Sequence, residues 1–328
     1  MTYLTENFTI KSVDLRSALN VSPATFNELQ KKYEIKSVDE TGKGTVKDIP
    51  PSECRRILEA RGFKYPTPAK IISLMMCKGG VGKTTTSLFL SQRLSSYGAK
   101  VLAVDADSQG NLTSAFNLDL YKFDIDESVP VLVDVLEEKV TIEEAIIAVT
   151  PNLHLIPSTP YNAILDGKIR EKYKNPSLAV SKFLNKIRTN YDYIIIDCAP
   201  ALNLTNTALI CASDTVILPA SPDRFSKIGL TQTLDEIKTL ENDFNLSIET
   251  KIVFTRFDAR EYTSLKYLSE IADEHKEKMF KTTIRTASDL KNAITKKEDL
   301  FSYKKSNAKE DYDSFTKELM GVTKLFEK

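Results

Sequence analysis

The sequence reads Cys77-Lys-Gly-Gly-Val-Gly-Lys-Thr-Thr85 between an apolar run at residues 71–76 and a helical pattern at residues 86–94. A strand, a glycine-rich loop and a helix in this order are typical of a phosphate-binding loop. Glycines let successive backbone N–H groups turn toward phosphate oxygens, and the helix adds the positive end of its dipole. The stretch therefore predicts a nucleotide site whose ligands are Gly79, Gly80, Val81, Gly82, Lys83, Thr84 and Thr85.

The start of this loop differs from the common pattern G-x-x-x-x-G-K-[ST]. The first glycine position is Cys77, and Lys78 follows it directly, so the loop matches the narrower form K-G-G-V-G-K-T-T. The second lysine, Lys83, is expected to neutralise the β- and γ-phosphates, and the Thr84 hydroxyl to bind Mg²⁺.

The composition is that of a globular chain with more than one unit. It has 328 residues, of which 41% are hydrophobic and 27% charged. No apolar run approaches the length of a membrane span, and the first residues lack the features of a signal peptide, so we expect a cytoplasmic protein. Four scattered cysteines and two histidines predict neither a disulfide framework nor a zinc site. Because the net charge is zero, a nucleic-acid surface would have to be a local patch.

Residues 1–68 are predicted to form a small separate domain. Helical spacing at residues 12–19 is followed by a turn, after which Ser22 as N-cap and Pro23 begin a second helix that extends to Tyr33. Segments 35–40 and 44–49 flank a turn and predict a β-hairpin, and a third helix follows at residues 50–61. This order resembles a winged helix-turn-helix of the MerR-like kind. A small helical dimerisation or docking module is the alternative.

Residues 69–328 alternate between predicted strands and helices, which indicates a doubly wound, mostly parallel α/β sheet. The strands are expected at residues 71–76, 100–105, 153–157, 191–197, 215–219 and 251–255. The helices are expected at residues 86–94, 142–149, 177–189, 226–243, 261–275 and 309–326, the last with an apolar stripe that ends at Phe326.

Carboxylates end two of these strands, at the edge where open α/β sheets bind ligands. Asp197 follows the apolar run Ile194–Ile196, as a Walker B acid does, and would orient Mg²⁺. Asp105 and Asp107 lie two residues apart at the end of the second strand. One would support the metal and the other would activate the attacking water, although either could instead cap the following turn.

The three segments K-G-G-V-G-K-T-T, V-L-A-V-D-A-D-S-Q-G-N and Y-I-I-I-D-C-A-P resemble those of the ParA family of partition ATPases, within the ParA/MinD class. The resemblance covers residue 70 to the end of the chain. It implies that Lys78 reaches the nucleotide of a partner subunit, that Lys83 and Asp107 act in catalysis, and that Thr84, Asp105 and Asp197 form the metal site. The cofactors implied are ATP and Mg²⁺. The chain departs from the family at Ser108, where a proline is usual, and at Thr283–Thr286, where the family often has Pro-Arg near the adenine.

DNA is the second ligand that the resemblance implies. Basic residues gather late in the chain, in a region that resembles the non-specific DNA-binding region of the family, and Arg256, Arg260 and Arg285 are the favoured contacts. A solvated charged face is the alternative. In the amino-terminal module, Thr25, Asn27 and Lys31 would face DNA.

The predicted function is ATP-dependent DNA partition. An ATP-bound homodimer would bind nucleoid DNA without sequence preference, a ParB-like partner would stimulate hydrolysis, and the amino-terminal domain would repress its own operon. An ATP-switched transcriptional regulator is the alternative. A MinD-like membrane protein is disfavoured because residues 309–328 are rich in acidic residues, and an iron–sulfur reductase because no cysteine lies between Cys77 and Cys198.

Overall fold

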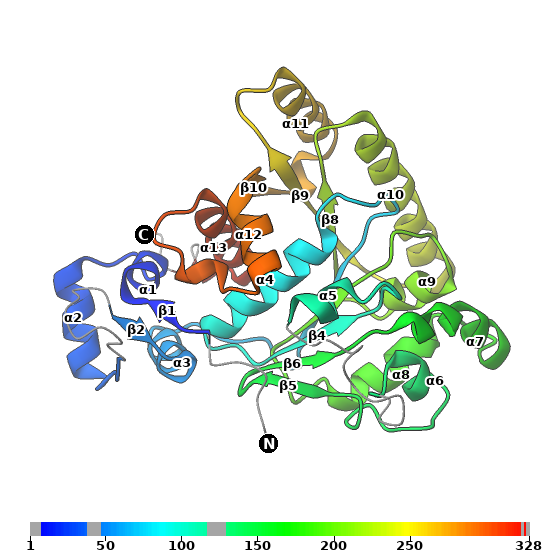
Figure 1. The fold of residues 1–328 in the computed structure, drawn as a ribbon, viewed down its shortest axis with the longest axis horizontal. Helices are drawn as coiled ribbons and strands as arrows, with labels where there is room; N and C mark the ends of the chain where they lie inside the picture. The colour runs from blue at the N-terminus through cyan, green and yellow to red at the C-terminus, as the bar shows by residue number, and fades with distance from the viewer. Residues whose placement is uncertain (1–7, 38–46, 117–128, 323–324, 326–328) are drawn as a thin grey trace.

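The computed structural model describes residues 8–37, 47–116, 129–322 and 325, and Figure 1 shows how their helices and strands are arranged. Within these residues, one large sheet has the strand order β10-β9-β8-β3-β7-β4-β6-β5, and a second, two-stranded sheet consists of β1 and β2. The large sheet comprises β3 (Lys70–Leu74), β4 (Val101–Asp105), β5 (Ile147–Thr150), β6 (Leu153–Ile156), β7 (Tyr193–Asp197), β8 (Thr215–Ala220), β9 (Glu249–Phe257) and β10 (Met279–Arg285). Its strands pair in parallel except β5, which is antiparallel to β6. The predicted doubly wound parallel sheet is confirmed.

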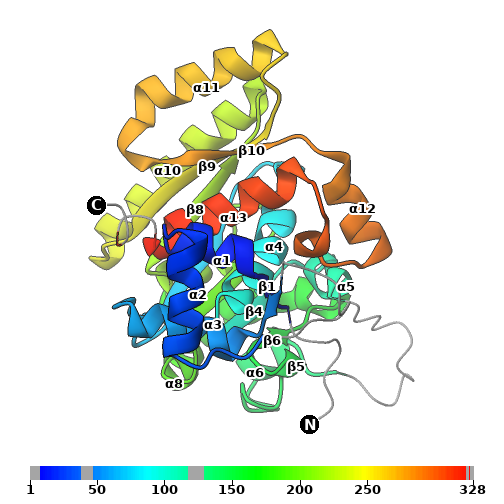
Figure 2. The ribbon, with the colours of Figure 1, turned by 90° about the vertical axis from the view of Figure 1, so that its left-hand side faces the viewer.

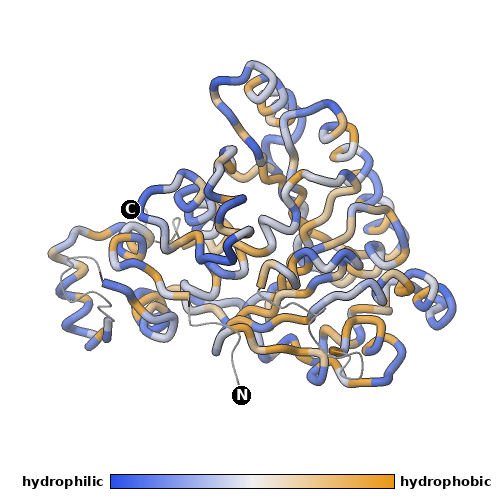
Figure 3. Tube along the Cα trace, viewed as in Figure 1, coloured by the Kyte–Doolittle hydropathy of each residue, from blue (hydrophilic) through white to orange (hydrophobic). Residues whose placement is uncertain are grey.

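Helices cover both faces of this sheet because successive strand residues point to opposite sides. In β3, Ile72 and Leu74 belong to one hydrophobic core and Ile71 to the other. The first core is completed by α4 (Lys83–Ser96), α5 (Asn111–Ala115), α12 (Ser288–Lys296), η4 (Leu300–Ser302) and α13 (Asn307–Met320). The second is completed by α6 (Leu132–Leu136), α7 (Leu165–Lys172), α8 (Leu178–Ile187), α9 (Leu204–Cys211), α10 (Arg224–Phe244) and α11 (Tyr262–His275). Two short 3₁₀ helices are η2 (Pro160–Ile164) and η3 (Lys276–Lys278). Figure 3 shows the hydrophobic colour concentrated along the central strands.

One predicted helix, at residues 142–149, is wrong. Residues 142–145 form a turn, and Ile147–Thr150 is the edge strand β5. The segment is short and rich in β-branched residues, and the free edge of β6 offers its backbone a ladder of hydrogen bonds that a two-turn helix would not match. The predicted carboxyl-terminal helix is confirmed as α13, and Phe326 lies outside the described residues.

The amino-terminal helices have the predicted order and caps. They are α1 (Ser12–Ala18), α2 (Pro23–Lys32) and α3 (Pro51–Ala60). The Ser22 side chain accepts a hydrogen bond from the Thr25 N–H at 3.1 Å, and Pro23 occupies the first turn of α2. The tip of the predicted hairpin, residues 38–46, lies outside the described residues. Residues 35–37 are not in a strand, and β2 (Asp48–Ile49) pairs instead with β1 (Ile10–Lys11). The winged helix therefore stays a prediction, as does the boundary at residue 68.

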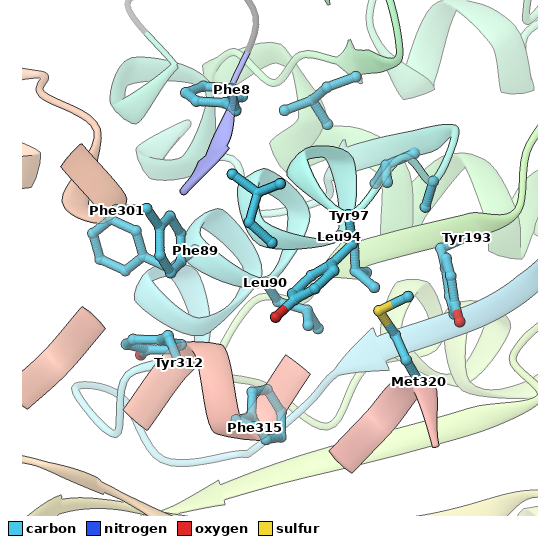
Figure 4. Packing of buried hydrophobic residues seen from close by; sticks show 14 of the residues in the cluster. Phe8, Phe89, Leu90, Leu94, Tyr97, Tyr193, Phe301, Tyr312, Phe315 and Met320 are labelled. Atoms are coloured by element: carbon cyan, nitrogen blue, oxygen red, sulfur yellow. The ribbon is translucent and has the colours of Figure 1, made fainter. Parts of the chain in front are cut away.

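The amino-terminal segment shares the first hydrophobic core with the rest of the chain. Figure 4 shows Phe8 near α4, on which Phe89 packs against Phe301 and Tyr312. On the surface of α3, Arg55 pairs with Asp192 at 2.6 Å. Figure 2 shows α1 in front of α4 and beside α13, where Asp14 of α1 lies 3.5 Å from Lys309. The segment is therefore docked onto the sheet domain by both apolar and ionic contacts.

Close packing of α3 on the end of α4 requires a glycine at position 98. Gly98 has a φ of +86°, and a Cβ there would lie 2.5 Å from the Pro51 carbonyl oxygen. Gly62 has a similar φ of +91°, but a Cβ there would meet no atom within 4 Å. We expect Gly98→Ala to lower the free energy of unfolding by about 2–5 kcal/mol, and Gly62→Ala by about 1–2 kcal/mol. Urea denaturation of both variants measures this, and equal losses would contradict the close approach of α3 to α4.

None of the described helices is both long and apolar enough to cross a membrane.

Candidate functional site

The glycine-rich loop joins β3 to α4, as the sequence predicts. Gly80 and Gly82 have φ values of +75° and +94°, which a residue with a side chain rarely adopts, and Gly82 is the N-cap of α4. Lys83 is the first residue of α4 and its side chain turns back into the loop, where its ammonium donates to the carbonyl oxygens of Met76 and Lys78, both at 3.2 Å. Burial lowers the pKa of Lys83, and the nearby Asp197 opposes this effect. The loop thus holds a cation at its centre, in the place where phosphate oxygens would need one.

Neighbouring strands bring the acidic residues to the same edge of the sheet as the loop. In the order β3-β7-β4, Asp197 is in register with Leu74 on one side and with Asp105 on the other. Both carboxyl groups are fully buried. The sequence predicts this meeting from the strand ends, and the topology of the sheet confirms it.

Asp105 uses its carboxylate to hold the loop that follows β4. One oxygen accepts from the Asp107 N–H at 3.2 Å, and the other accepts from the Thr113 N–H at 2.8 Å and the Thr113 hydroxyl at 2.7 Å. This is the turn-capping role that the sequence left open. Asp105 is therefore better placed to fix the position of Asp107 than to bind a metal ion directly.

Asp107 itself is half-buried and has one oxygen engaged, which accepts from the Gln109 N–H at 3.0 Å. Among the described residues, no group donates a hydrogen bond to its other oxygen. A carboxylate oriented in this way beside the phosphate loop could accept a proton from an attacking water.

Asp197 has one oxygen suited to a metal shell. Oδ1 accepts from the Ser87 hydroxyl at 3.0 Å, whereas Oδ2 is buried and has no hydrogen-bond partner among the described residues. A buried oxygen without a partner is costly unless a ligand satisfies it, and magnesium with its bound waters would do so. The described residues contain no cluster of three or more histidine, cysteine, aspartate or glutamate side chains that could hold a metal ion. The residues therefore fit Mg²⁺ brought by a nucleotide, held by phosphate oxygens, Thr84 and waters oriented by Asp197.

The two buried carboxyls predict a pH-dependent stability for the nucleotide-free protein. Burial, together with repulsion from Asp105, raises the pKa of Asp197 to about 7, and burial raises that of Asp105 to about 6, from an ordinary value of 3.8. Between pH 4 and 7 the folded state therefore holds protons that the unfolded chain releases, so this contribution to stability falls as the pH rises.

Replacing Asp197 by asparagine removes its share of this effect. We expect Asp197→Asn to be more stable relative to wild type at pH 8 than at pH 5, in urea denaturation without nucleotide or Mg²⁺. The exposed Asp243 gives a control, because Asp243→Asn should shift stability little at either pH. If the free energies of unfolding of Asp197→Asn and wild type differed by the same amount at both pH values, the raised pKa of Asp197 would be contradicted.

A cavity of about 350 Å³ opens beside the first turn of α4. It is lined by Gly82 and Thr85 on one side and by Ile284, Arg285 and Thr286 on the other, so residues 284–286 lie next to the loop. Further lining residues, which the sequence analysis did not single out, are Thr255, Ala287, Leu290, Lys291, Ile294 and Tyr312. No motif marks these residues because they come from β9, α12 and α13. The cavity has the position and the apolar walls that the base of a nucleotide bound to the loop would need.

The three arginines predicted to contact DNA have different surroundings. Arg256 is exposed at the end of β9 with a φ of +54°. The Arg260 side chain is 89% exposed and pairs with Asp258 at 2.6 Å. Arg285 pairs with Asp311 at 2.6 Å and also lies 3.4 Å from Glu310. Arg256 and Arg260 are thus accessible to phosphates, although Asp258 pairs with Arg260. Arg285 is less exposed, and two carboxylates compensate its charge.

The predicted DNA-facing residues of α2 are exposed. Thr25, Asn27 and Lys31 point to solvent, and Phe26 and Leu29 are buried, as the helical spacing predicts. Their contact with DNA stays a prediction.

Lys78 has a partner that the sequence analysis missed. Its ammonium lies 2.5 Å from an oxygen of Asp223, the N-cap residue of α10. A signal was present, because Ser-Pro-Asp-Arg follows β8 and is typical of a helix start, and β8 is the neighbour of β3.

Comparison with known proteins agrees with this geometry. A family model described as an AAA domain matches residues 69–250. The sporulation initiation inhibitor protein Soj of Bacillus subtilis is 33% identical over 217 residues, which cover 66% of this chain and 83% of Soj. The virulence plasmid ParA family protein pGP5-D of Chlamydia psittaci is 30% identical over 263 residues, which cover 78% of this chain and 96% of that protein.

Among solved structures, a putative plasmid partition protein from Borrelia burgdorferi bound to AMPPNP has a TM-score of 0.63 and 28% identity, over 79% of this chain and 98% of that one. The family model matches more than half of the chain, and within the matched residues the glycine-rich loop and the two acidic strand ends lie at one edge of the parallel sheet. The chain therefore belongs to the ParA/Soj family of P-loop ATPases.

Proposed function

We propose that this protein is an ATP-dependent DNA partition protein. The observation that carries the proposal is the division of the loop's two lysines: Lys83 is buried in the loop, and Lys78 turns out of it to the surface beside α10. One lysine can serve the chain's own ATP, while the other lies at the surface, where it can serve that of a second copy, as an arginine finger does. ATP would then close a symmetric homodimer.

ATP and Mg²⁺ are the proposed cofactors. Lys83, the backbone of residues 79–85 and the cavity beside Thr85 would bind the nucleotide, while Thr84 and the free oxygen of Asp197 would hold the metal shell. The bound metal would neutralise charge on the transferring phosphate. Asp107, oriented by Asp105, would accept the proton of the attacking water.

The ATP-bound dimer would bind nucleoid DNA without sequence preference, through exposed cations such as Arg256 and Arg260. A ParB-like partner would stimulate hydrolysis and so release the dimer from DNA. The amino-terminal module would bind an operator through α2 and repress the protein's own operon.

A mobility shift with unrelated DNA duplexes tests the proposal, with ADP, ATP and a nonhydrolysable analogue. We expect wild type to shift the DNA only with ATP or the analogue, and Lys83→Ala and Lys78→Ala to lose the shift. Lys174→Ala is the control, because this lysine is exposed in the loop after α7 and should behave as wild type. DNA binding that is indifferent to nucleotide, or unaffected by Lys83→Ala, would refute the proposal.

A transcriptional regulator switched by ATP is the second candidate. The exposed polar face of α2, with Thr25, Asn27 and Lys31, is the observation that favours it. Footprinting together with plasmid inheritance separates the two functions. Sequence-specific binding with no effect on inheritance would favour the regulator.

A further inference from the structure

We propose that Asp223 is a positioning residue for Lys78. It holds the Lys78 ammonium at the amino end of α10 in the single chain, and the ammonium leaves it when a second ATP-bound copy of the chain presents its phosphates. This inference rests on the proposed ATP-dependent dimer. It adds that Lys78 must leave the Asp223 carboxylate before it can reach the partner's nucleotide.

The Asp223 carboxylate is fixed in place before it meets Lys78. Its Oδ1 accepts from the Ser226 N–H at 3.0 Å, and its Oδ2 accepts from the Ser221 hydroxyl at 2.8 Å. These contacts, with the positive end of α10, favour the ionised carboxylate. Because the acceptor is held by its own turn, Lys78 is the mobile member of the pair.

The backbones on both sides of the pair are packed tightly together. A Cβ on Gly229 would lie 3.2 Å from the Cys77 sulfur, and the Thr233 hydroxyl accepts from the Cys77 N–H at 3.4 Å. Figure 1 shows the loop before α4, in cyan, reaching α10. Since the loop and the helix are in contact here, Lys78 can leave Asp223 by side-chain rotation without a change in the backbone.

The ion pair is accessible to a competing anion. The side chains of Lys78 and Asp223 are 28% and 40% exposed, so water and phosphate can both reach them. Lys83, by contrast, is 6% exposed and bonded to two carbonyl oxygens within its own loop. Without ATP, the two lysines therefore have different partners: carbonyl oxygens bind the ammonium of Lys83, and a carboxylate binds that of Lys78.

The expected effect on dimerisation follows from symmetry. A two-fold dimer breaks two such pairs, one in each chain. Because a half-exposed pair contributes weakly, removing both should tighten the dimer by roughly 2- to 30-fold.

Sedimentation velocity of the full chain with Mg²⁺ and AMPPNP, over a range of protein concentrations, tests the proposal. Asp223→Asn removes the charge and keeps a side chain that can cap α10. We expect its dimer dissociation constant to fall by about 2- to 30-fold relative to wild type, and Asp223→Glu to return toward the wild-type value. Loss of a merely structural contact would weaken the dimer, so the direction of the change is the deciding readout.

The outcomes separate this inference from the proposed function. If wild type dimerises with AMPPNP and Asp223→Asn dimerises equally or more weakly, the role of Asp223 is overturned and the dimer stands. If neither protein dimerises with AMPPNP at any concentration, the ATP-dependent dimer is overturned, and the role of Asp223 with it.

Discussion

Asp107→Ala is expected to lose ATP hydrolysis while it keeps ATP-dependent DNA binding. Removal of a general base typically lowers the rate by about 10²–10⁴-fold. The change leaves the phosphate loop intact, because Lys83 is held by the carbonyl oxygens of Met76 and Lys78 rather than by Asp107. Phosphate release measures the first effect, and a mobility shift with ATP measures the second.

The neighbouring Ser108 provides a control for this prediction. It follows Asp107 directly in the chain, and Ser108→Ala should leave hydrolysis within a few-fold of wild type. If Asp107→Ala hydrolysed ATP at the wild-type rate, the catalytic carboxylate would have to be another residue. If Asp107→Ala also failed to bind DNA with ATP, Asp107 would be needed to form the ATP-bound state itself.

Arg93→Met is expected to cause a loss of about 3–5 kcal/mol in the free energy of unfolding. Arg93 lies on α4, and its side chain is 1% exposed. Its guanidinium lies 2.6 Å from Asp313 of α13 and 3.2 Å from Asp14 of α1. Burial alone would raise the pKa of Asp313, but Arg93 and Lys317 hold it below its ordinary value. Methionine would fill similar space and leave the buried Asp313 carboxylate with Lys317 and the Tyr97 hydroxyl as its partners.

Urea denaturation of the full chain measures this loss. Arg170→Met is the matched control, because the Arg170 side chain is 77% exposed and its removal should change stability by at most about 0.5 kcal/mol. Equal losses in the two variants would show that the buried ion pairs do not hold α1, α4 and α13 together. Asp14→Asn should have a smaller effect than Arg93→Met, since it leaves the 2.6 Å pair between Arg93 and Asp313 in place.

Local patterns were sufficient to predict the phosphate loop and the acidic strand ends. Each depends on a few adjacent residues: glycines that permit a positive φ at positions 80 and 82, and an apolar strand that ends in Asp197. The edge strand Ile147–Thr150 was not predictable in the same way, because a short apolar segment takes its conformation from the neighbour that it pairs with.

The features of the site that the sequence did not predict depend on contacts between segments that are distant in the chain. Asp223 lies 145 residues after Lys78, and only the adjacency of β3 and β8 brings them together. The same is true of the cavity beside Thr85, whose walls come from β9, α12 and α13. For Asp105 the local pattern was misleading. Its spacing from Asp107 suggested a metal ligand, but one of its oxygens accepts from Thr113 of the next helix and the other from the Asp107 N–H.

The sequence by itself determined the nature of the chemistry, because a P-loop, a Walker B strand and the D-x-D-x-Q-G-N segment are local patterns set by backbone conformation and strand ends. Only the tertiary structure decided how the two loop lysines are held, since the partners of Lys78 and Lys83 depend on which elements pack beside the loop. It also decided that α1 docks onto α4 and α13 through Arg93. Burial is the physical reason, because a charged side chain removed from water is costly unless it is paired, and the fold determines which residue the partner is.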